Sequence, residues 1–90
     1  MFHLEIKPTT ECDFQRGSGD SQVKHYHANI NTKEMCVQIC LGMQKSTHPA
    51  VNGVSMDVNK RACYCHEGMV GRNEQMINES SCFLPASGMF

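Results

Sequence analysis

The chain has 90 residues, a formal net charge of -1 and 19% charged residues. This length suits one small domain whose core alone gives marginal stability, and the near-neutral charge argues against a surface for nucleic acid or for anionic membranes. Six cysteines in so short a chain are typical of a secreted domain held together by disulfides.

The first part of the chain predicts two strands separated by a polar turn. Residues 2–7 alternate apolar and polar side chains, which predicts a half-buried strand that ends before Pro8. Residues 15–22 are polar and rich in glycine and predict a turn or loop. Residues 23–30 alternate more weakly and predict a second strand.

Residues 31–46 predict the single helix of the domain. Asn31 is a suitable N-cap, and Glu34 three residues later resembles the end of a capping box. Pro49 cannot continue a helix. The apolar stripe that we expect to face the core consists of Met35, Cys36, Ile39, Cys40 and Met43.

The second part of the chain predicts an antiparallel hairpin and a closing strand. The expected elements are a loop over 46–53, strands over 53–58 and 62–67 joined by a turn at 59–61, a loop over 68–80 and a strand over 80–84. This order predicts an α+β domain, in which one helix packs on a small antiparallel sheet. We expect one domain over 1–90, with its core over about 2–84 and a flexible tail over 85–90.

The spacing of four cysteines suggests that the helix is bonded to the hairpin. Cys36 and Cys40 lie four positions apart on the helix, and Cys63 and Cys65 lie two positions apart on a strand, so each pair shares one face. The two spacings, about 6 Å along a helix and about 6.7 Å along a strand, nearly match. Two neighbouring bridges can therefore form between these elements.

The pairing depends on the direction in which the helix crosses the strand. An antiparallel crossing pairs Cys36 with Cys65 and Cys40 with Cys63, whereas a parallel crossing exchanges the partners. Cys12 and Cys82 remain near the two ends of the chain, where a bridge would close the domain. Among the 15 possible pairings we favour the nested set Cys12–Cys82, Cys36–Cys65 and Cys40–Cys63.

The motifs "CVQIC" at 36–40, "NGVSMDVNKRACYC" at 52–65 and "SCFL" at 81–84 resemble those of the PAN/apple family. The resemblance covers roughly residues 2–84, although this chain places both strand cysteines in one C-x-C. It implies a sheet with one helix stapled to its central strands by two disulfides, and in apple-type members a third bridge between the ends. It also implies an extracellular module that binds protein or carbohydrate.

Catalytic and metal-binding chemistry are both weakly supported. A C-x-C is a poor zinc knuckle, and zinc would leave Cys12 and Cys82 unexplained. The chain lacks the C-x-x-C of a redox enzyme and any serine or paired-carboxylate motif. His66 should point away from both strand cysteines. We therefore expect no enzyme activity, no metal and no cofactor.

His25 and His27 form an H-x-H pair on one face of the strand expected over 23–30. Such a pair can bind a metal or titrate near neutral pH. The sequence places no third ligand beside it. We prefer the simpler interpretation of a solvated strand face, and keep both histidines as ligand-binding candidates.

The remaining candidates for ligand binding are polar or aromatic. Tyr26 and Tyr64, if exposed, can serve as stacking platforms for a sugar or as anchors for a protein. Arg72 and Asn73 are polar groups of the kind that sugar sites use, although a solvated loop is the simpler interpretation. Asn78 begins the sequon "NES", a candidate N-glycosylation site.

We expect an extracellular binding module for a carbohydrate or protein partner, belonging to a larger secreted or surface protein. Self-association through an exposed apolar patch is one form of protein binding. The alternative is a free-standing secreted effector, such as a signalling peptide, toxin or protease inhibitor, and a third hypothesis is a metal-stabilised intracellular domain.

We expect no nucleic-acid binding, because the chain is nearly neutral. We also expect no membrane insertion, since no apolar run reaches about 18 residues. Residues 1–10 lack signal-peptide features, so if the chain is secreted we expect it to be a mature or excised form.

Overall fold

The computed structural model describes residues 12–85. The strand predicted over 2–7, and residues 86–90 of the predicted tail, lie outside the described residues. The elements, in chain order, are β1 (Gln15–Arg16), β2 (Ser18–Asp20), β3 (Val23–His27), α1 (Lys33–Lys45), β4 (Val51–Asp57), β5 (Ala62–Glu67), β6 (Gly71–Asn73) and β7 (Ser80–Phe83).

Five strands form an antiparallel sheet in the order β1-β7-β4-β5-β3, and β2 and β6 form a separate two-stranded antiparallel ribbon. The predicted hairpin is confirmed as β4 and β5, in which Val54 pairs with Cys65 and Met56 with Cys63. Asp57 closes its turn by accepting a hydrogen bond from the Lys60 amide at 3.2 Å. The strands predicted over 23–30 and 80–84 correspond to β3 and β7.

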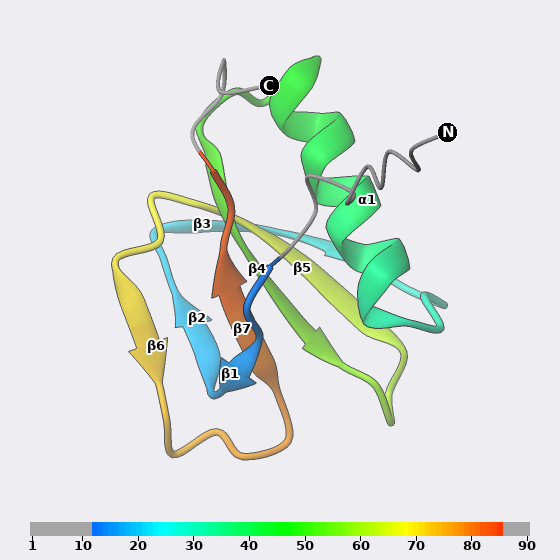
Figure 1. Cartoon of the computed structure of the whole chain (residues 1–90), viewed down its shortest axis with the longest axis vertical. Helices are drawn as coiled ribbons and strands as arrows, with labels where there is room; N and C mark the ends of the chain where they lie inside the picture. Colours follow the sequence, from blue (N-terminus) through cyan, green and yellow to red (C-terminus); the bar gives the residue numbers. More distant parts are fainter. Residues whose placement is uncertain (1–11, 86–90) are drawn as a thin grey trace, which may run out of the picture.

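The sheet lies between the helix and the ribbon. Helix α1 packs against β4 and β5, whereas β2 contacts β4 and β7, and Figure 1 shows α1 and the β2–β6 ribbon on different sides of the sheet. The side chains of Val54, Met56 and Cys65 face the helix, and Ser55 on the opposite face bonds to β2. The expected α+β arrangement, one helix on a small antiparallel sheet, is therefore confirmed.

The N-cap of the helix lies one residue later than predicted. Thr32, in an extended conformation, is the N-cap, and its hydroxyl accepts a hydrogen bond from the Met35 amide at 3.1 Å. Asn31 is not the cap, and Glu34 lies in the first turn without forming the predicted capping box. Threonine is itself a favoured N-cap residue, so the helix can begin directly after Thr32.

The buried stripe of the helix is also rotated from the predicted one. The buried residues are Cys36, Val37, Cys40, Leu41 and Gln44. Met35 is 44% exposed, and Ile39 and Met43 are only partly buried against the core. The stripe keeps its predicted spacing but begins one residue later, because Val37 and Leu41, and not Met35 and Ile39, flank the cysteines on the side that faces the sheet.

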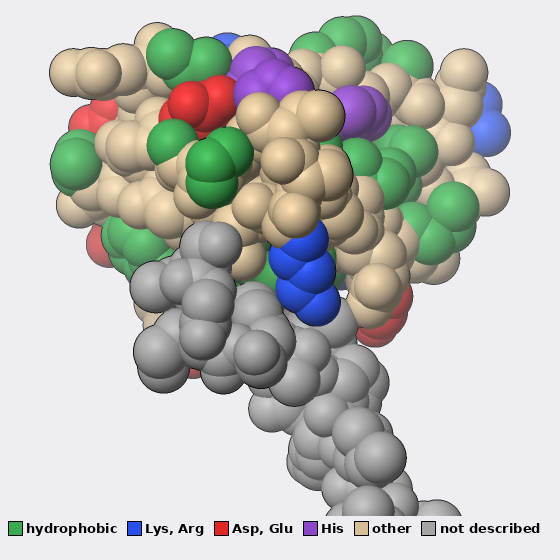
Figure 2. Space-filling view, turned by 90° about the horizontal axis from the view of Figure 1, so that it is seen from above, with side chains coloured by type: hydrophobic (Ala, Val, Ile, Leu, Met, Phe, Trp, Pro, Cys, Tyr) green, Lys and Arg blue, Asp and Glu red, His purple; other side chains and the backbone are tan. Residues whose placement is uncertain are grey.

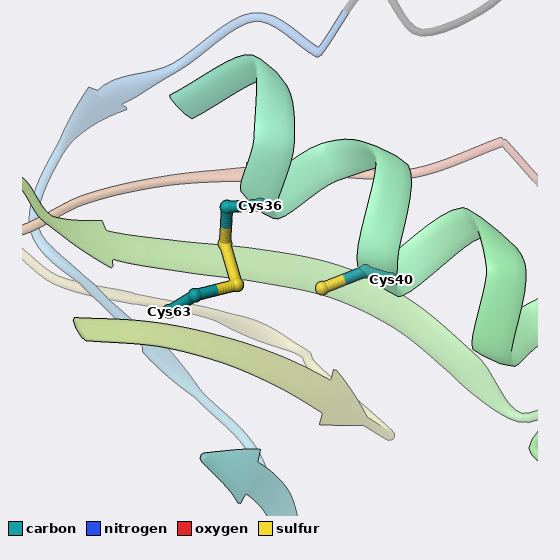
Figure 3. Close-up of side chains that lie close together, drawn as sticks. All are labelled: Cys36, Cys40 and Cys63. Carbon is teal, nitrogen blue, oxygen red and sulfur yellow. A yellow bond between two sulfur atoms is a disulfide. The ribbon is translucent and has the colours of Figure 1, made fainter. Parts of the chain in front are cut away.

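Three disulfides connect the helix, the sheet and the N-terminal segment. The bridge between Cys12 and Cys82 is the predicted one. Cys36 is bonded to Cys63 and Cys40 to Cys65, so the favoured pairs Cys36–Cys65 and Cys40–Cys63 were wrong. Figure 3 shows the reason: α1 crosses β5 with both chains running in the same direction, and Cys36 therefore lies over the first strand cysteine.

The three shortest strands lie in segments that were predicted as loops. Both β1 and β2 fall within 15–22, and β6 falls within 68–80. Each has only two or three residues, so a period of two cannot be recognised in the sequence. Gly17, with φ at +124°, allows the sharp reversal between β1 and β2, where a Cβ atom would lie 2.9 Å from the Asn73 carbonyl oxygen.

Candidate functional site

Two tyrosines form an aromatic platform on the face of the sheet opposite the helix. Tyr26 on β3 and Tyr64 on β5 are direct cross-strand partners. Their ring centroids lie 5.4 Å apart with an interplanar angle of 33°. Tyr26 is 60% exposed, and Tyr64 is partly exposed. The structure thus brings together the two residues that the sequence suggested separately, and we call this pair the tyrosine platform.

Charged groups lie near Tyr64. The Lys24 ammonium lies 5.0 Å from the centroid of the Tyr64 ring, a cation–π contact. The pKa of the Tyr64 hydroxyl is raised above its usual value of 10.0, mainly by burial and further by the carboxylate of Glu79, by Tyr26 and by Asp57. This shift only moves the pKa further above neutral pH, where a tyrosine hydroxyl is already protonated and can donate a hydrogen bond to a ligand.

The two histidines of the H-x-H pair lie on the other face of β3, the one beside the helix. His25 pairs with Cys65 and His27 with Cys63 on β5, and both cysteines are bonded to the helix. His25 Nε2 lies 2.7 Å from Glu67 Oε2, and the His25 ring meets that of His48 edge-on at 4.6 Å. His27 contacts the Met43 sulfur at 3.4 Å instead. The histidines are therefore separate from the tyrosine platform.

Figure 2 views this end of the molecule and shows histidine side chains at the surface with an acidic side chain beside them. One potential ligand atom each from His25, His48 and Glu67 lies within 4.8 Å of the other two. Sequence reasoning missed His48 and Glu67 because both are distant from the H-x-H pair along the chain.

Arg72 and Asn73 lie in strand β6, not in a loop, and neither is at the platform. The Arg72 guanidinium donates to the Ser81 hydroxyl at 3.1 Å and to the Ser81 carbonyl at 3.3 Å, and a longer bond reaches Gln15. The Asn73 side chain accepts from the Gln75 amide at 3.1 Å. Both side chains therefore stabilise the ribbon and its connection to the sheet.

Asn78, the first residue of the sequon, is exposed in the segment that precedes β7. A glycosylation acceptor must be accessible at the surface. The position of Asn78 therefore meets the steric requirement, and modification at this site stays a prediction.

His66 is a buried polar residue whose network the sequence did not reveal. It points away from the helix, as expected. Its Nε2 lies 2.6 Å from the Ser55 hydroxyl, and its Nδ1 lies 2.7 Å from the Ser21 hydroxyl. The Ser55 oxygen also accepts from the Gly19 amide at 2.7 Å. A serine paired with a histidine can suggest a nucleophile, but Ser55 and His66 are both fully buried. Their contact links β4 to β5, and the bonds from Gly19 and Ser21 hold the β2 segment against the sheet.

The cysteines Cys36, Cys40 and Cys63 also lie close enough together to hold a metal ion. All three are in disulfides, as are the other three cysteines of the chain. Zinc binds the thiolate form of cysteine, which the bridged sulfurs do not provide. This cluster therefore has a structural role.

Comparisons with family models, with curated proteins and with solved structures find no match to this chain. Among the described residues, no helix combines the length and hydrophobicity needed to cross a bilayer. Three disulfides are consistent with an oxidising, extracellular environment.

Proposed function

We propose that this chain is an extracellular recognition module that binds carbohydrate at the tyrosine platform. The observation that carries the proposal is the pair of adjacent rings, 5.4 Å apart, of which that of Tyr26 is largely open to solvent. An aromatic ring with a polar end suits the apolar C–H face and the hydroxyl groups of a sugar ring.

The polar groups at the platform supply hydrogen bonds that fix the orientation of a ligand. The Tyr64 hydroxyl is protonated at neutral pH, as a tyrosine hydroxyl ordinarily is, and can donate a hydrogen bond. Lys24 lies beside the same ring and carries a positive charge. This arrangement favours a sugar with hydroxyl or acidic groups at its edge.

The proposed location and class depend on three further observations. The three disulfides favour an oxidising compartment. Asn78 presents an exposed sequon. The motifs of the chain resemble those of PAN/apple modules, which are extracellular, bind protein or carbohydrate and usually belong to larger proteins. We therefore propose that this module is part of a secreted or surface protein.

A protein partner, including a second copy of this chain, is the second candidate. Met76 and Ile77, in the connection between β6 and β7, are 48% and 66% exposed. Adjacent exposed apolar side chains are typical of contact surfaces between proteins. In this alternative the connection, and not the tyrosine platform, carries the binding energy.

A glycan array probed with the oxidised protein tests the first candidate. We expect binding to a defined class of sugar that Tyr26→Ala abolishes, that Tyr26→Phe largely retains, and that Ile77→Ala leaves unchanged. Circular dichroism and the intact three-disulfide mass verify that each variant is folded. Absence of glycan binding, or equal binding by Tyr26→Ala and the wild type, would reject carbohydrate recognition at the platform.

A further inference from the structure

We propose that His25, His48 and Glu67 form a binding site for a divalent transition-metal ion, with zinc as its most suitable occupant. The site lies on the helix side of the sheet and is independent of the tyrosine platform. Its three ligands come from strand β3, from the connection between α1 and β4, and from strand β5. One potential ligand atom of each lies within 4.8 Å of the other two.

The sheet fixes two of the three ligands. His25 is opposite Cys65 in the pairing of β3 with β5, and Glu67 lies two residues further along β5 on the same face. The two side chains therefore meet diagonally, with 2.7 Å between Nε2 and Oε2. Cys65 is itself bonded to Cys40 of the helix, so a disulfide anchors the backbone beneath the site.

The backbone of His48 is held by hydrogen bonds at both of its polar groups. Its amide donates to the Met43 carbonyl at 2.7 Å, and its carbonyl accepts from the Val51 amide at 3.0 Å. The Thr47 hydroxyl lies 2.6 Å from Nδ1. When Nδ1–H donates to this hydroxyl, Nε2 carries the lone pair that a metal requires, and such a second partner orients ligating histidines in known sites.

The exposure of the site suits an ion that enters from solvent. The side chains of His25 and Glu67 are 28% and 24% exposed, and His48 is also partly buried. The donor atoms are thus accessible but partly shielded from water, which strengthens the attraction between a carboxylate and a cation.

The donor set selects the class of ion. Two imidazole nitrogens and one carboxylate oxygen suit zinc and its neighbours in the transition series, whereas magnesium and calcium prefer oxygen ligands alone. Tetrahedral zinc, with bonds of about 2.05 Å, needs its ligand atoms about 3.3 Å apart. His25 Nε2 and Glu67 Oε2, now 2.7 Å apart, would have to separate by about 0.6 Å to reach this spacing. The other pairs of ligand atoms, which lie within 4.8 Å, would have to approach by at most about 1.5 Å, and side-chain rotation can supply both movements. A fourth position remains for water or an external donor.

Titration calorimetry of the oxidised, tag-free protein with zinc ions tests the site. We expect one zinc per chain with a dissociation constant below about 100 µM, and at least about tenfold weaker binding in His25→Gln, His48→Gln and Glu67→Gln. His27→Gln, two residues from His25 on the same face, is the matched control, with affinity within about twofold of the wild type.

The spectrum of bound cobalt gives a second measurement on the same variants. Cobalt in place of zinc should show visible absorption bands that His48→Gln removes, and this substitution in a connecting segment leaves the sheet intact. The proposal is overturned by the absence of saturable one-to-one zinc binding below about 100 µM, a range far weaker than folded zinc sites show. It is equally overturned if His27→Gln weakens binding as much as the ligand substitutions.

Discussion

The Ser55 hydroxyl on β4 lies 2.6 Å from His66 Nε2 on β5, and both residues are fully buried beneath β2. When the imidazole is neutral, both ring nitrogens of His66 and both serine hydroxyls have a hydrogen-bond partner. Ser55 then donates to Nε2, and Nδ1–H donates to Ser21, whose hydroxyl donates to the Val23 carbonyl at 3.0 Å. A proton on Nε2 would displace the Ser55 hydroxyl hydrogen from its acceptor, so the fold favours neutral His66.

The first prediction is that stability falls as the pH is lowered below neutrality. The pKa of His66 is lowered from 6.5 to about 4, mainly by burial and further by Lys24. Between these values the unfolded chain binds a proton that the folded chain does not. This stabilisation is complete above the pKa of the unfolded state and is lost as the pH falls toward the pKa of the folded state. The expected loss between pH 7.5 and 5.5 is about 1.4 kcal/mol.

Urea denaturation of the oxidised protein at these two pH values measures the effect. His66→Gln should be less stable at pH 7.5, and its free energy of unfolding should depend much less on pH in this interval. His27→Gln, which leaves the network unchanged, should keep the dependence of the wild type. An unchanged pH dependence in His66→Gln would show that another group titrates.

The second prediction concerns Gly19, which passes directly over this network. A Cβ atom at Gly19 would lie 2.7 Å from His66 Nε2 and 2.9 Å from the Ser55 hydroxyl. Gly19→Ala must displace β2 or the histidine, and we expect a loss of about 1–3 kcal/mol in the free energy of unfolding. Gly42 in the helix meets nothing within 4 Å, so Gly42→Ala should instead stabilise by up to about 1 kcal/mol.

Chemical denaturation of both glycine variants at pH 7.5 provides the comparison. The same substitution should change stability in opposite directions at the two sites. Equal stability of Gly19→Ala and the wild type would mean that β2 does not pack closely over His66.

The third prediction concerns the pairing of the helix and strand cysteines. Removing Cys36 and Cys63 together leaves Cys40 bonded to Cys65 and Cys12 to Cys82. The double variant Cys36→Ala with Cys63→Ala should therefore fold with no free thiols, at a cost of about 2–4 kcal/mol. The double variant Cys36→Ala with Cys65→Ala removes one partner from each bridge and should lose more stability.

Thiol titration and intact mass distinguish the two double variants. The mismatched variant leaves Cys40 and Cys63 without their native partners, so two free thiols or a mixture of disulfide isomers is expected. The opposite result, with no free thiols only in the mismatched variant, would restore the nested pairing favoured from sequence.

The direction of the helix across β5 could not be obtained from sequence because the cysteine spacings are symmetrical. Cysteines four residues apart on a helix are separated by about 6 Å, and cysteines two residues apart on a strand by about 6.7 Å. These separations match whichever way the helix runs across the strand. The direction follows from the topology instead, because the connection from α1 leads into β4, which pairs antiparallel with β5. By contrast, the hairpin of β4 and β5 was predictable, because local alternation and a short polar turn specify it.

The two surface sites differ in how much of each the sequence revealed. Tyr26 and Tyr64 were recognised as candidates, since exposed tyrosines are suitable for recognition, but their contact depends on the pairing of β3 with β5. His25 was recognised through the H-x-H pair. Its neighbours His48 and Glu67 come from two other segments, 23 and 42 residues further along the chain, and no local pattern links them.

The fourth prediction separates structural from ligand-binding roles for Arg72. Its guanidinium donates two hydrogen bonds to Ser81 and one to Gln15, and it lies 5.9 Å from the centroid of the Phe83 ring. Lysine keeps the charge but cannot reproduce this planar set of donors. Arg72→Lys should therefore lower the free energy of unfolding by about 1 kcal/mol without changing glycan binding at the tyrosine platform.

Urea denaturation and the glycan array, applied to the same Arg72→Lys sample, measure the two effects independently. Lys60→Arg, in the turn between β4 and β5, is the control for an exchange between lysine and arginine. It should leave both stability and glycan binding unchanged. Loss of glycan binding with unchanged stability would place Arg72 in the recognition surface, as the sequence first suggested, and would move that surface from the tyrosine platform toward β6.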